Sequence, residues 1–138
     1  MTTTGVEEYL GAIYRLCESP ERPLRLSRLQ EYLNFTPISI HEMIQKLEKQ
    51  ALVSYVPYHG VTLTEKGKRI AASLVRRHRI WERFLTDQLK LPLDQVHEIA
   101  GQLEHAASET VTERLADFMG DPERCPHGSL IPEIPMGK

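Results

Sequence analysis

Cysteine is scarce in this 138-residue chain, which contains only Cys17 and Cys125. Two cysteines cannot build the disulfide framework of a small secreted domain, and no signal-peptide pattern opens the sequence. The longest apolar runs fall far short of the roughly 20 residues that span a bilayer. We therefore expect a soluble cytoplasmic protein with no membrane segment. Its length suits one moderate domain, or one domain with an appended helical unit, that buries its own core.

A strong excess of one charge is also missing, because the net charge is -2 and the pI is near 6.3. The overall basic footprint of many nucleic-acid binders is therefore absent, but the charges are segregated along the chain. Residues 66–83 carry seven basic residues and one acidic residue, whereas residues 84–138 carry four basic and ten acidic residues. The basic block could meet phosphates or form a solvated helix face, and the acidic last third is suited to holding cations.

Enzyme signatures are absent as well, since the chain has no HExxH pair, nucleophile elbow or phosphate loop. The sequence therefore predicts a protein that is not an enzyme and has no small-molecule substrate. A metalloenzyme is the alternative, because His, Glu and Cys side chains around an open metal position could activate water.

The chain does contain a concentration of potential metal ligands in its second half. Seven residues offer imidazole, carboxylate or thiolate donors: His78, Glu82, His97, Glu104, His105, Cys125 and His127. His78 and Glu82 are four residues apart and share one face of a helix. Each residue alone has an ordinary reading as a surface histidine, a solvated ion pair or a buried thiol. The combination favours a site for manganese or ferrous iron, with zinc as a further candidate, over calcium or magnesium.

Apolar periodicity predicts a mainly α protein. Residues recur at helical spacing over 7–16, 26–33, 37–50, 64–89, 92–107 and 109–119. A β-rich run over residues 52–64, with a turn containing Pro57 and Gly60, predicts a two-stranded hairpin. The Pro-rich tail from Pro122 onward is expected to be irregular.

The order of helix, short helix, turn, helix and hairpin is that of a winged helix-turn-helix, which favours DNA binding. In that architecture the third helix enters the major groove and the hairpin wing contacts the backbone. Residues off the buried stripe of the third helix would face DNA, and Arg25 and Lys46 are candidate phosphate contacts. The predicted DNA-facing set is Arg25, Ser39, His41, Glu42, Gln45 and Lys46. A protein-interaction module of the same architecture is the alternative.

Several motifs together resemble the diphtheria-toxin-repressor family of metal-dependent regulators, which includes the manganese-transport regulators. They are EYLGAIY at 8–14, LTEKG at 63–67, RHRIWERFL at 77–85, HE at 97–98, EH at 104–105, CPHG at 125–128 and IP at 131–132. The resemblance spans nearly the whole chain. It implies a homodimer that binds a double-stranded DNA operator when a divalent metal is bound, as a repressor of manganese or iron homeostasis genes.

The same resemblance implies a division into two domains. Residues 1–70 would form the winged helix-turn-helix DNA-binding domain, and residues 71–138 a helical dimerisation and metal-binding domain. A long helix over about 65–89 would link them, and the SH3-like domain of longer members would be missing. Residues 93–119 are the expected dimer interface, although their apolar side chains could instead fill the core of the chain itself.

By position, the family's ancillary metal site falls on His78, Glu82 and His97. In the version of this site seen in manganese-responsive members, Glu82 joins Cys125 and His127. The resemblance therefore implies that both ligand sets of this site are present in one chain.

The family's other metal site falls on Glu8, Glu104 and His105, with His78 able to contribute. Gly11 and Gly101 stand where other members have donors, and glycine has no ligating side chain. This departure leaves open a metal-insensitive winged-helix dimer whose ligand-like residues are structural.

Overall fold

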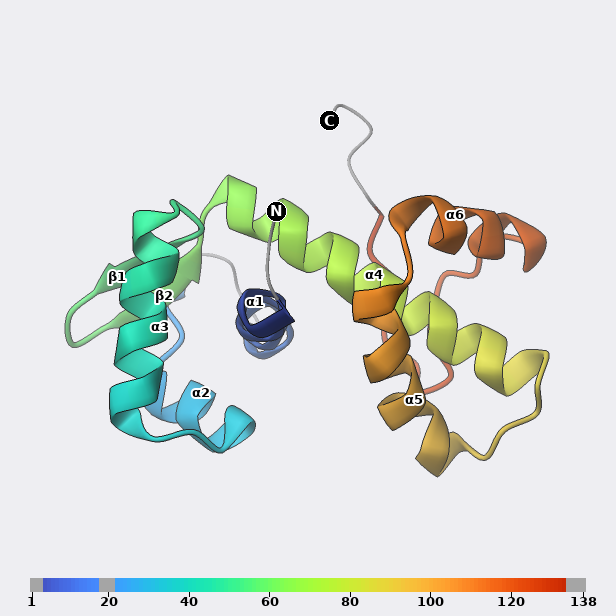
Figure 1. Cartoon of the computed structure of the whole chain (residues 1–138), viewed down its shortest axis with the longest axis horizontal. Coiled ribbons are helices and arrows are strands. Elements are labelled where there is room, and N and C mark those ends of the chain that lie inside the picture. The colour runs from blue at the N-terminus through green and yellow to red at the C-terminus, as the bar shows by residue number, and fades with distance from the viewer. Residues whose placement is uncertain (1–3, 18–21, 134–138) are drawn as a thin grey trace. The chain divides into compact units, whose positions relative to one another are not determined.

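The structure is a computed structural model, which describes residues 4–17 and 22–133. Its elements follow the order that the periodicity predicts (Figure 1). They are α1 (Thr4–Leu16), α2 (Leu26–Leu33), α3 (Pro37–Lys49), β1 (Val53–Val56), β2 (Gly60–Leu63), α4 (Glu65–Asp87), α5 (Leu93–Ala106) and α6 (Glu109–Phe118). The predicted class, mainly α with a winged helix-turn-helix and a two-stranded wing, is confirmed. None of the described helices is long and apolar enough to cross a membrane.

The chain divides into two compact units, residues 1–71 and residues 72–138. The first unit has a core to which α1, α2, α3 and the hairpin all contribute. Leu10 and Ile13 of α1 and Ile40 and Ile44 of α3 are almost completely buried. Their spacing of three and four residues places them on one face of each helix, which is why the apolar pattern predicted these helices.

Local signals set the boundaries of α2 and α3. α2 ends at Leu33, and its C-cap Asn34 adopts the left-handed conformation with a φ of 59°. α3 begins after Thr36, whose hydroxyl oxygen accepts a hydrogen bond from the Ser39 amide at 3.2 Å, and Pro37 occupies the first turn. Such capping satisfies an amide that the helix itself leaves unpaired.

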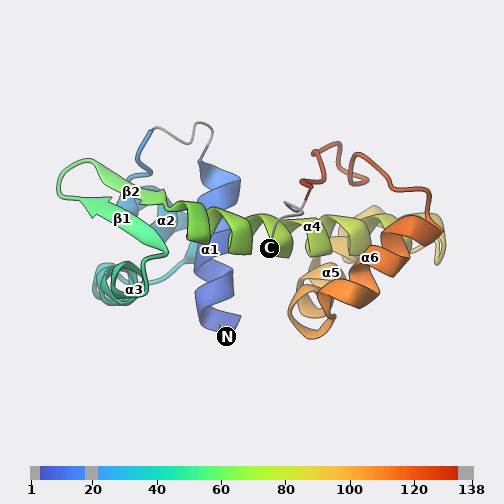
Figure 2. The same ribbon diagram turned by 90° about the horizontal axis from the view of Figure 1, so that it is seen from above.

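The wing is an antiparallel hairpin in which Val53 pairs with Leu63 and Val56 pairs with Gly60. Leu24 forms a further β-bridge with Val61 through two backbone hydrogen bonds of 2.8 and 2.9 Å. Gly60 has a φ of 130°, and a Cβ there would collide with the Leu24 carbonyl. Glycine is therefore required at the start of β2. α3 lies beside β1 in both ribbon views (Figures 1 and 2).

Gly67, in the first turn of α4, has a similar packing role. A Cβ at this position would collide with the Leu52 carbonyl. The Thr64 hydroxyl donates to the Ala51 carbonyl at 2.7 Å and accepts from the Gly67 amide at 3.1 Å. Close approach of two backbones thus explains a glycine that is unfavourable for helix propensity alone.

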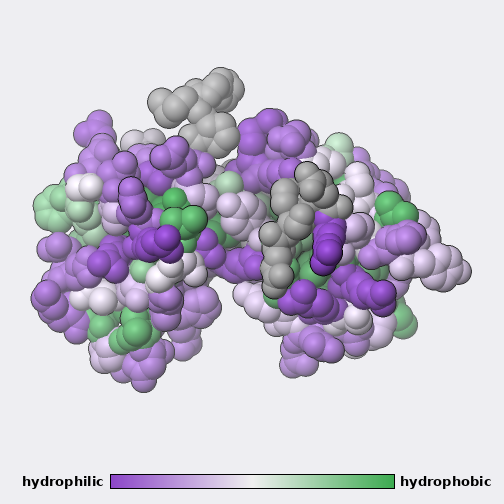
Figure 3. All heavy atoms as spheres, turned by 180° about the vertical axis from the view of Figure 1, so that it is seen from behind, coloured by the Kyte–Doolittle hydropathy of each residue, from purple (hydrophilic) through white to green (hydrophobic). Residues whose placement is uncertain are grey.

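In the second unit, α5 and α6 pack against the later part of α4 around two small apolar clusters. One cluster is built on Ile80 with Ala116 and Ile131, and the other on Leu85 with Val96 and Ala100. The visible face in Figure 3 is largely polar, with apolar side chains in small separate patches.

A buried arginine joins α4 to α6 and to the tail. The Arg76 guanidinium donates to both carboxylate oxygens of Glu113, at 2.6 and 2.8 Å, and to the Pro132 carbonyl at 3.1 Å. Its side chain is only 9% exposed. This two-point geometry holds two chain segments in a defined position against α4.

Candidate metal centre and nucleic-acid face

Five of the predicted metal ligands lie close together within the second unit. His78 and Glu82 project from one face of α4 and are both buried. His97 is on α5, and Cys125 and His127 are in the turn that follows α6. Three segments far apart in the sequence therefore supply donors to one place.

Three imidazoles face a single carboxylate oxygen. Glu82 Oε2 lies 3.3 Å from His78 Nε2, 3.3 Å from His97 Nδ1 and 3.4 Å from His127 Nδ1. His78 Nε2 and His97 Nδ1 are 3.0 Å apart. Ligand atoms that surround one ion at about 2.1 Å are separated by about 3.0–3.4 Å, so these distances fit a divalent transition metal.

The donor atoms form two sets of three, and Glu82 belongs to both. The histidine set is His78, Glu82 and His97, and the thiolate set is Glu82, Cys125 and His127. Within each set the donor atoms lie within 4.8 Å of one another. Imidazole, carboxylate and thiolate in this arrangement suit manganese, ferrous iron or zinc.

Glu104 supports the cluster from behind His78. Its Oε1 lies 3.0 Å from His78 Nδ1, and both side chains are buried. This contact orients the ring so that Nε2 points toward Glu82 and His97. A carboxylate in this position fixes the ring and raises the basicity of the ligating nitrogen.

The charges of the cluster favour an ion pair in the metal-free protein. Burial lowers the pKa of His78, but hydrogen bonds and charge from Glu104 and Glu82 outweigh it, so the pKa is raised. Burial raises the pKa of Glu82, but the hydrogen bond and charge of His78 and the charge of His127 outweigh it, so the pKa is lowered. The raised pKa means that protons compete with a metal ion for the His78 ring more strongly than for a free imidazole.

Backbone hydrogen bonds shape the turn that carries Cys125 and His127. The Cys125 amide donates to the Ser129 carbonyl at 2.9 Å, and the Gly128 amide donates to the Cys125 carbonyl at 2.9 Å. Gly128 has a φ of 94°, which favours glycine. The Arg79 guanidinium on α4 donates to the Leu130 carbonyl. These contacts fix Cys125 and His127 beside α4.

The residues predicted for the other metal site are divided between the units. Glu8 lies exposed on α1 in the first unit, and His105 is half-buried on α5 in the second. Within the second unit, Glu104 is brought together with His78. Gly101 borders this pair, and a Cβ there would meet only Glu104 Oε1, at 3.8 Å.

The predicted DNA-facing residues of α3 are solvent-exposed. They are Ser39, His41, Glu42, Gln45 and Lys46. His41 also packs edge-on against Tyr55 of β1, with ring centroids 6.0 Å apart, so it links the helix to the wing. Two exposed apolar residues were not in the predicted set, namely Ile38 on α3 and Tyr58 at the wing tip, which are 73% and 98% exposed. The sequence offered a signal for each exposed residue, because Ile38 lies off the buried stripe of α3 and Tyr58 lies in the turn of the hairpin.

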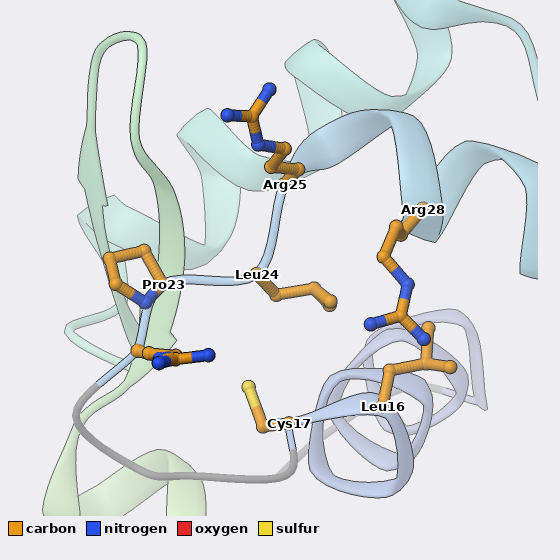
Figure 4. A pocket seen from close by; sticks show the side chains of 7 residues that line it. Leu16, Cys17, Pro23, Leu24, Arg25 and Arg28 are labelled. Carbon is orange, nitrogen blue, oxygen red and sulfur yellow. The ribbon is translucent and has the colours of Figure 1, made fainter.

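Arg25, the predicted phosphate contact outside α3, is exposed at the N-cap position of α2. It borders a hollow of about 290 Å³ that Arg28 and Cys17 also line. In Figure 4 the Arg25 side chain points away from this hollow, whereas the Arg28 guanidinium points toward it. Burial raises the pKa of the Cys17 thiol, although the positive charges of Arg28 and Lys68 act to lower it.

The predicted interface residues of the second unit divide between core and surface. Val96 and Ala100 are completely buried within the chain. Val111 and Phe118 on α6 are 52% and 71% exposed. Val96 and Ala100 therefore fill the core of the chain itself, whereas Val111 and Phe118 are not part of that core.

Two family models match the chain. One, described as "Iron dependent repressor, N-terminal DNA binding domain", matches residues 1–61. The other, described as "Iron dependent repressor, metal binding and dimerisation domain", matches residues 64–133.

Curated proteins and solved structures are similar over most of the chain. An uncharacterized HTH-type transcriptional regulator of Methanocaldococcus jannaschii is 38% identical over 115 residues, which are 83% of this chain and 92% of that protein. The iron-dependent repressor IdeR of Mycobacterium tuberculosis is 36% identical over 128 residues, which are 93% of this chain and 55% of that protein. The structure of the manganese regulator SloR matches with a TM-score of 0.81 and 37% identity, covering 96% of this chain and 61% of that chain. The chain thus spans about half the length of IdeR.

Proposed function

The chain belongs to the iron-dependent repressor family, and we propose that it is a metal-dependent DNA-binding transcriptional repressor. It acts as a homodimer on a double-stranded operator in the cytoplasm and regulates manganese or iron homeostasis genes. The observation that carries this proposal is the convergence of three imidazoles on Glu82 in a chain that also presents a winged helix-turn-helix. The family is one of repressors, and no enzymatic activity is proposed.

The proposed regulatory metal is Mn²⁺ or Fe²⁺, with Zn²⁺ as a further candidate. Its ligands come from the histidine set and the thiolate set around Glu82. The ligand-like spacing of the donor atoms and the buried support from Glu104 favour this assignment. A bound ion would join α4, α5 and the turn after α6.

A second metal position is proposed for Glu104 and His105 of the second unit. Its donor set there is reduced by Gly101, which has no ligating side chain. Because Glu104 also holds His78, occupancy of this position would compete with that contact. We therefore propose that it binds metal more weakly than the cluster around Glu82.

The first unit is proposed to read DNA through α3. Ser39, His41, Glu42 and Gln45 would face base edges in the major groove, whereas Lys46 and Arg25 would contact phosphates. A dimer would place two α3 helices on successive half-sites, and the exposed Val111 and Phe118 of α6 are suited to the dimer interface.

Metal binding and DNA binding would be coupled through geometry. The donors of the three segments already lie together, so a bound ion would hold α4, α5 and the turn after α6 in one fixed arrangement. Coupling between two such sites typically amounts to about 1–3 kcal/mol, a severalfold to hundredfold change in operator occupancy. A metal-insensitive winged-helix dimer is the competing reading, because Gly11 and Gly101 lack side-chain donors.

Fluorescence anisotropy with the DNA upstream of its own gene tests the proposal. Affinity should rise severalfold to a hundredfold when chelator is replaced by Mn²⁺ or Fe²⁺. A Lys46→Ala variant should bind more weakly and show a log-affinity against log-salt slope that is smaller by about one. Equal affinity with chelator and with metal would support the metal-insensitive reading instead.

A further inference from the structure

Tyr58 lies at the tip of the wing, where its backbone takes an unusual conformation. β1 ends at Val56 and β2 begins at Gly60, so residues 57–59 form the connecting turn. The His59 amide donates to the Val56 carbonyl at 3.0 Å, and Tyr58 has a φ of 70°. A turn closed in this way, with proline second and a positive φ third, is of type II and favours glycine or asparagine at the third position. Tyrosine therefore occupies a position that its backbone disfavours.

The Tyr58 side chain gains nothing from packing that would offset this cost. Its ring is 98% exposed, whereas Tyr9 in the core of the same unit is 3% exposed. The turn projects away from the helices of the first unit in both ribbon views (Figures 1 and 2). Residues in sparsely populated backbone conformations cluster at functional sites. The positive φ and the exposed ring together indicate that Tyr58 contacts another molecule.

The wing is held in a fixed position beside α3, the helix proposed to enter the major groove. His41 of α3 packs edge-on against Tyr55 of β1. The Tyr55 amide also donates to the Glu48 carboxylate of α3 at 3.2 Å. On the other strand, Val61 is completely buried and forms the β-bridge to Leu24. DNA that binds α3 therefore meets the wing tip at a defined distance from the half-site.

The chemistry of the tip suits the minor groove better than the phosphates. Residues 53–63 include no Lys, Arg, Asp or Glu, so the wing lacks the basic side chains that neutralise phosphates. The minor groove is about 6 Å wide, which admits a flat aromatic ring. At A·T pairs its floor presents only acceptors, to which the Tyr58 hydroxyl can donate. A G·C pair adds the guanine amino group, which is a donor and obstructs the ring.

We propose that Tyr58 inserts into the minor groove beside the half-site read by α3 and selects A·T pairs there. This groove lies about half a helical turn, or roughly 5 base pairs, from the centre of the half-site. The tip falls within residues 1–61, which match the family model of the DNA-binding domain. The inference rests on the proposed function, because it assigns part of the operator specificity to a residue outside α3.

A base analogue that changes only the minor groove tests the assignment. Fluorescence anisotropy would use the DNA upstream of the protein's own gene with Mn²⁺ present. Each A·T pair near the half-sites is replaced in turn by 2,6-diaminopurine·T, which adds the minor-groove amino group of guanine and keeps the major-groove edge of adenine. Wild type should lose about fivefold or more in affinity at one position beside each half-site, whereas Tyr58→Gly should lose less than about twofold there. Equal losses for the two proteins at every position would overturn the proposal.

Inosine provides the reverse substitution. An inosine·C pair keeps the major-groove edge of G·C but lacks the minor-groove amino group. Placed at the same two positions, G·C should weaken the binding of wild type, and inosine·C should restore it to within about twofold of the A·T level. Failure of inosine·C to restore the affinity would assign the preference to the major groove, which contradicts the proposal.

Variants of Tyr58 separate DNA binding from folding. Tyr58→Gly suits the positive φ, so its thermal unfolding midpoint should not fall below that of wild type, while its operator affinity should fall about tenfold. Tyr58→Phe keeps the ring and removes the hydroxyl, so its affinity should fall by less. Ser54→Ala, a control at an exposed position of β1, should bind like wild type. An operator affinity of Tyr58→Gly equal to that of wild type would overturn the proposal.

The salt dependence provides a further check on the kind of contact. The log-affinity against log-salt slope should be the same in Tyr58→Gly and wild type, because the side chain is uncharged. In Lys46→Ala, by contrast, the slope should be smaller by about one. A slope that fell in Tyr58→Gly as it does in Lys46→Ala would show that the tip acts through phosphates and would contradict a groove contact.

Repeating the diaminopurine scan with chelator in place of Mn²⁺ separates the inference from the proposed function. Operator affinity that ignores metal, with the Tyr58-dependent positions still present, would refute the regulatory role and leave the inference standing. Metal-dependent binding without any Tyr58-dependent position would do the reverse.

Discussion

Replacing Arg76 by methionine removes the contact that fixes the tail against α4. Arg76 makes three hydrogen bonds, two to Glu113 and one to the Pro132 carbonyl, from a side chain that is 9% exposed. Methionine keeps the length and the apolar packing of the side-chain stem but donates no hydrogen bond. The Arg76→Met variant therefore isolates the polar contribution.

The expected loss of stability is about 2 kcal/mol. Hydrogen bonds to charged groups contribute about 1.5–3 kcal/mol each when they are protected from water. Glu113 is 42% exposed, so water hydrates the released carboxylate and reduces the loss. Pro132 lies just beyond the turn that carries Cys125 and His127, so Cd²⁺ affinity should also fall, by about tenfold or less.

The assay is urea unfolding followed by circular dichroism on the metal-free protein. Arg83→Met serves as the matched control on the same helix. Arg83 pairs with Asp87 at 2.9 Å, but both side chains are about one-third exposed, so its loss should cost no more than about 0.5 kcal/mol. Equal destabilisation by the two substitutions would refute the reasoning that burial and geometry make Arg76 different.

Two further predictions concern glycine positions and pH. Gly101→Ala should stabilise the protein by about 0.5–1 kcal/mol, because a Cβ fits at this position and alanine favours helix. Gly67→Ala should destabilise the protein by more than about 2 kcal/mol, because its Cβ would collide with the Leu52 carbonyl. Thermal unfolding that ranks the two variants in the opposite order would contradict this account of the packing. Because the pKa of His78 is raised on folding, His78 stabilises the protein below about pH 6.5, and this stability is lost as the pH rises through the folded pKa. Because the pKa of Glu82 is lowered on folding, Glu82 stabilises the protein above about pH 4.5, and this stability is lost as the pH falls through the folded pKa. The cluster should therefore stabilise the metal-free protein most between these two pH limits. Mn²⁺ affinity measured by calorimetry should increase as the pH rises and His78 loses its proton. An affinity that stays constant from pH 6 to pH 8 would argue against His78 as a ligand.

Local patterns in the sequence were sufficient to predict the helices and the wing. Apolar residues three and four apart fixed the buried faces of α1 and α3, and turn residues marked the hairpin. These signals lie within a few residues of one another, so they can be read without knowledge of tertiary packing. The requirement for Gly67 could not be read in this way, because it arises from the Leu52 carbonyl of another segment.

The candidate site was predictable by residue type but not by geometry. The kinds of donor and their family positions pointed to His78, Glu82 and Cys125. Nothing local indicated that Glu104 would hold His78 across 26 residues, or that Arg76 would reach Pro132 across 56. Such contacts depend on how α5, α6 and the tail pack against α4, which periodicity does not encode. The assignment of each ligand remains a prediction.

Operator affinity of the Glu82→Gln variant tests the central claim most directly. Glutamine keeps the size of the side chain but removes the charge that both donor sets share. In fluorescence anisotropy, wild type and the exposed-residue control Glu109→Gln should gain affinity severalfold to a hundredfold with Mn²⁺, whereas Glu82→Gln should gain less than twofold. An Mn²⁺ response in Glu82→Gln equal to that of wild type would show that this cluster is not the regulatory metal site.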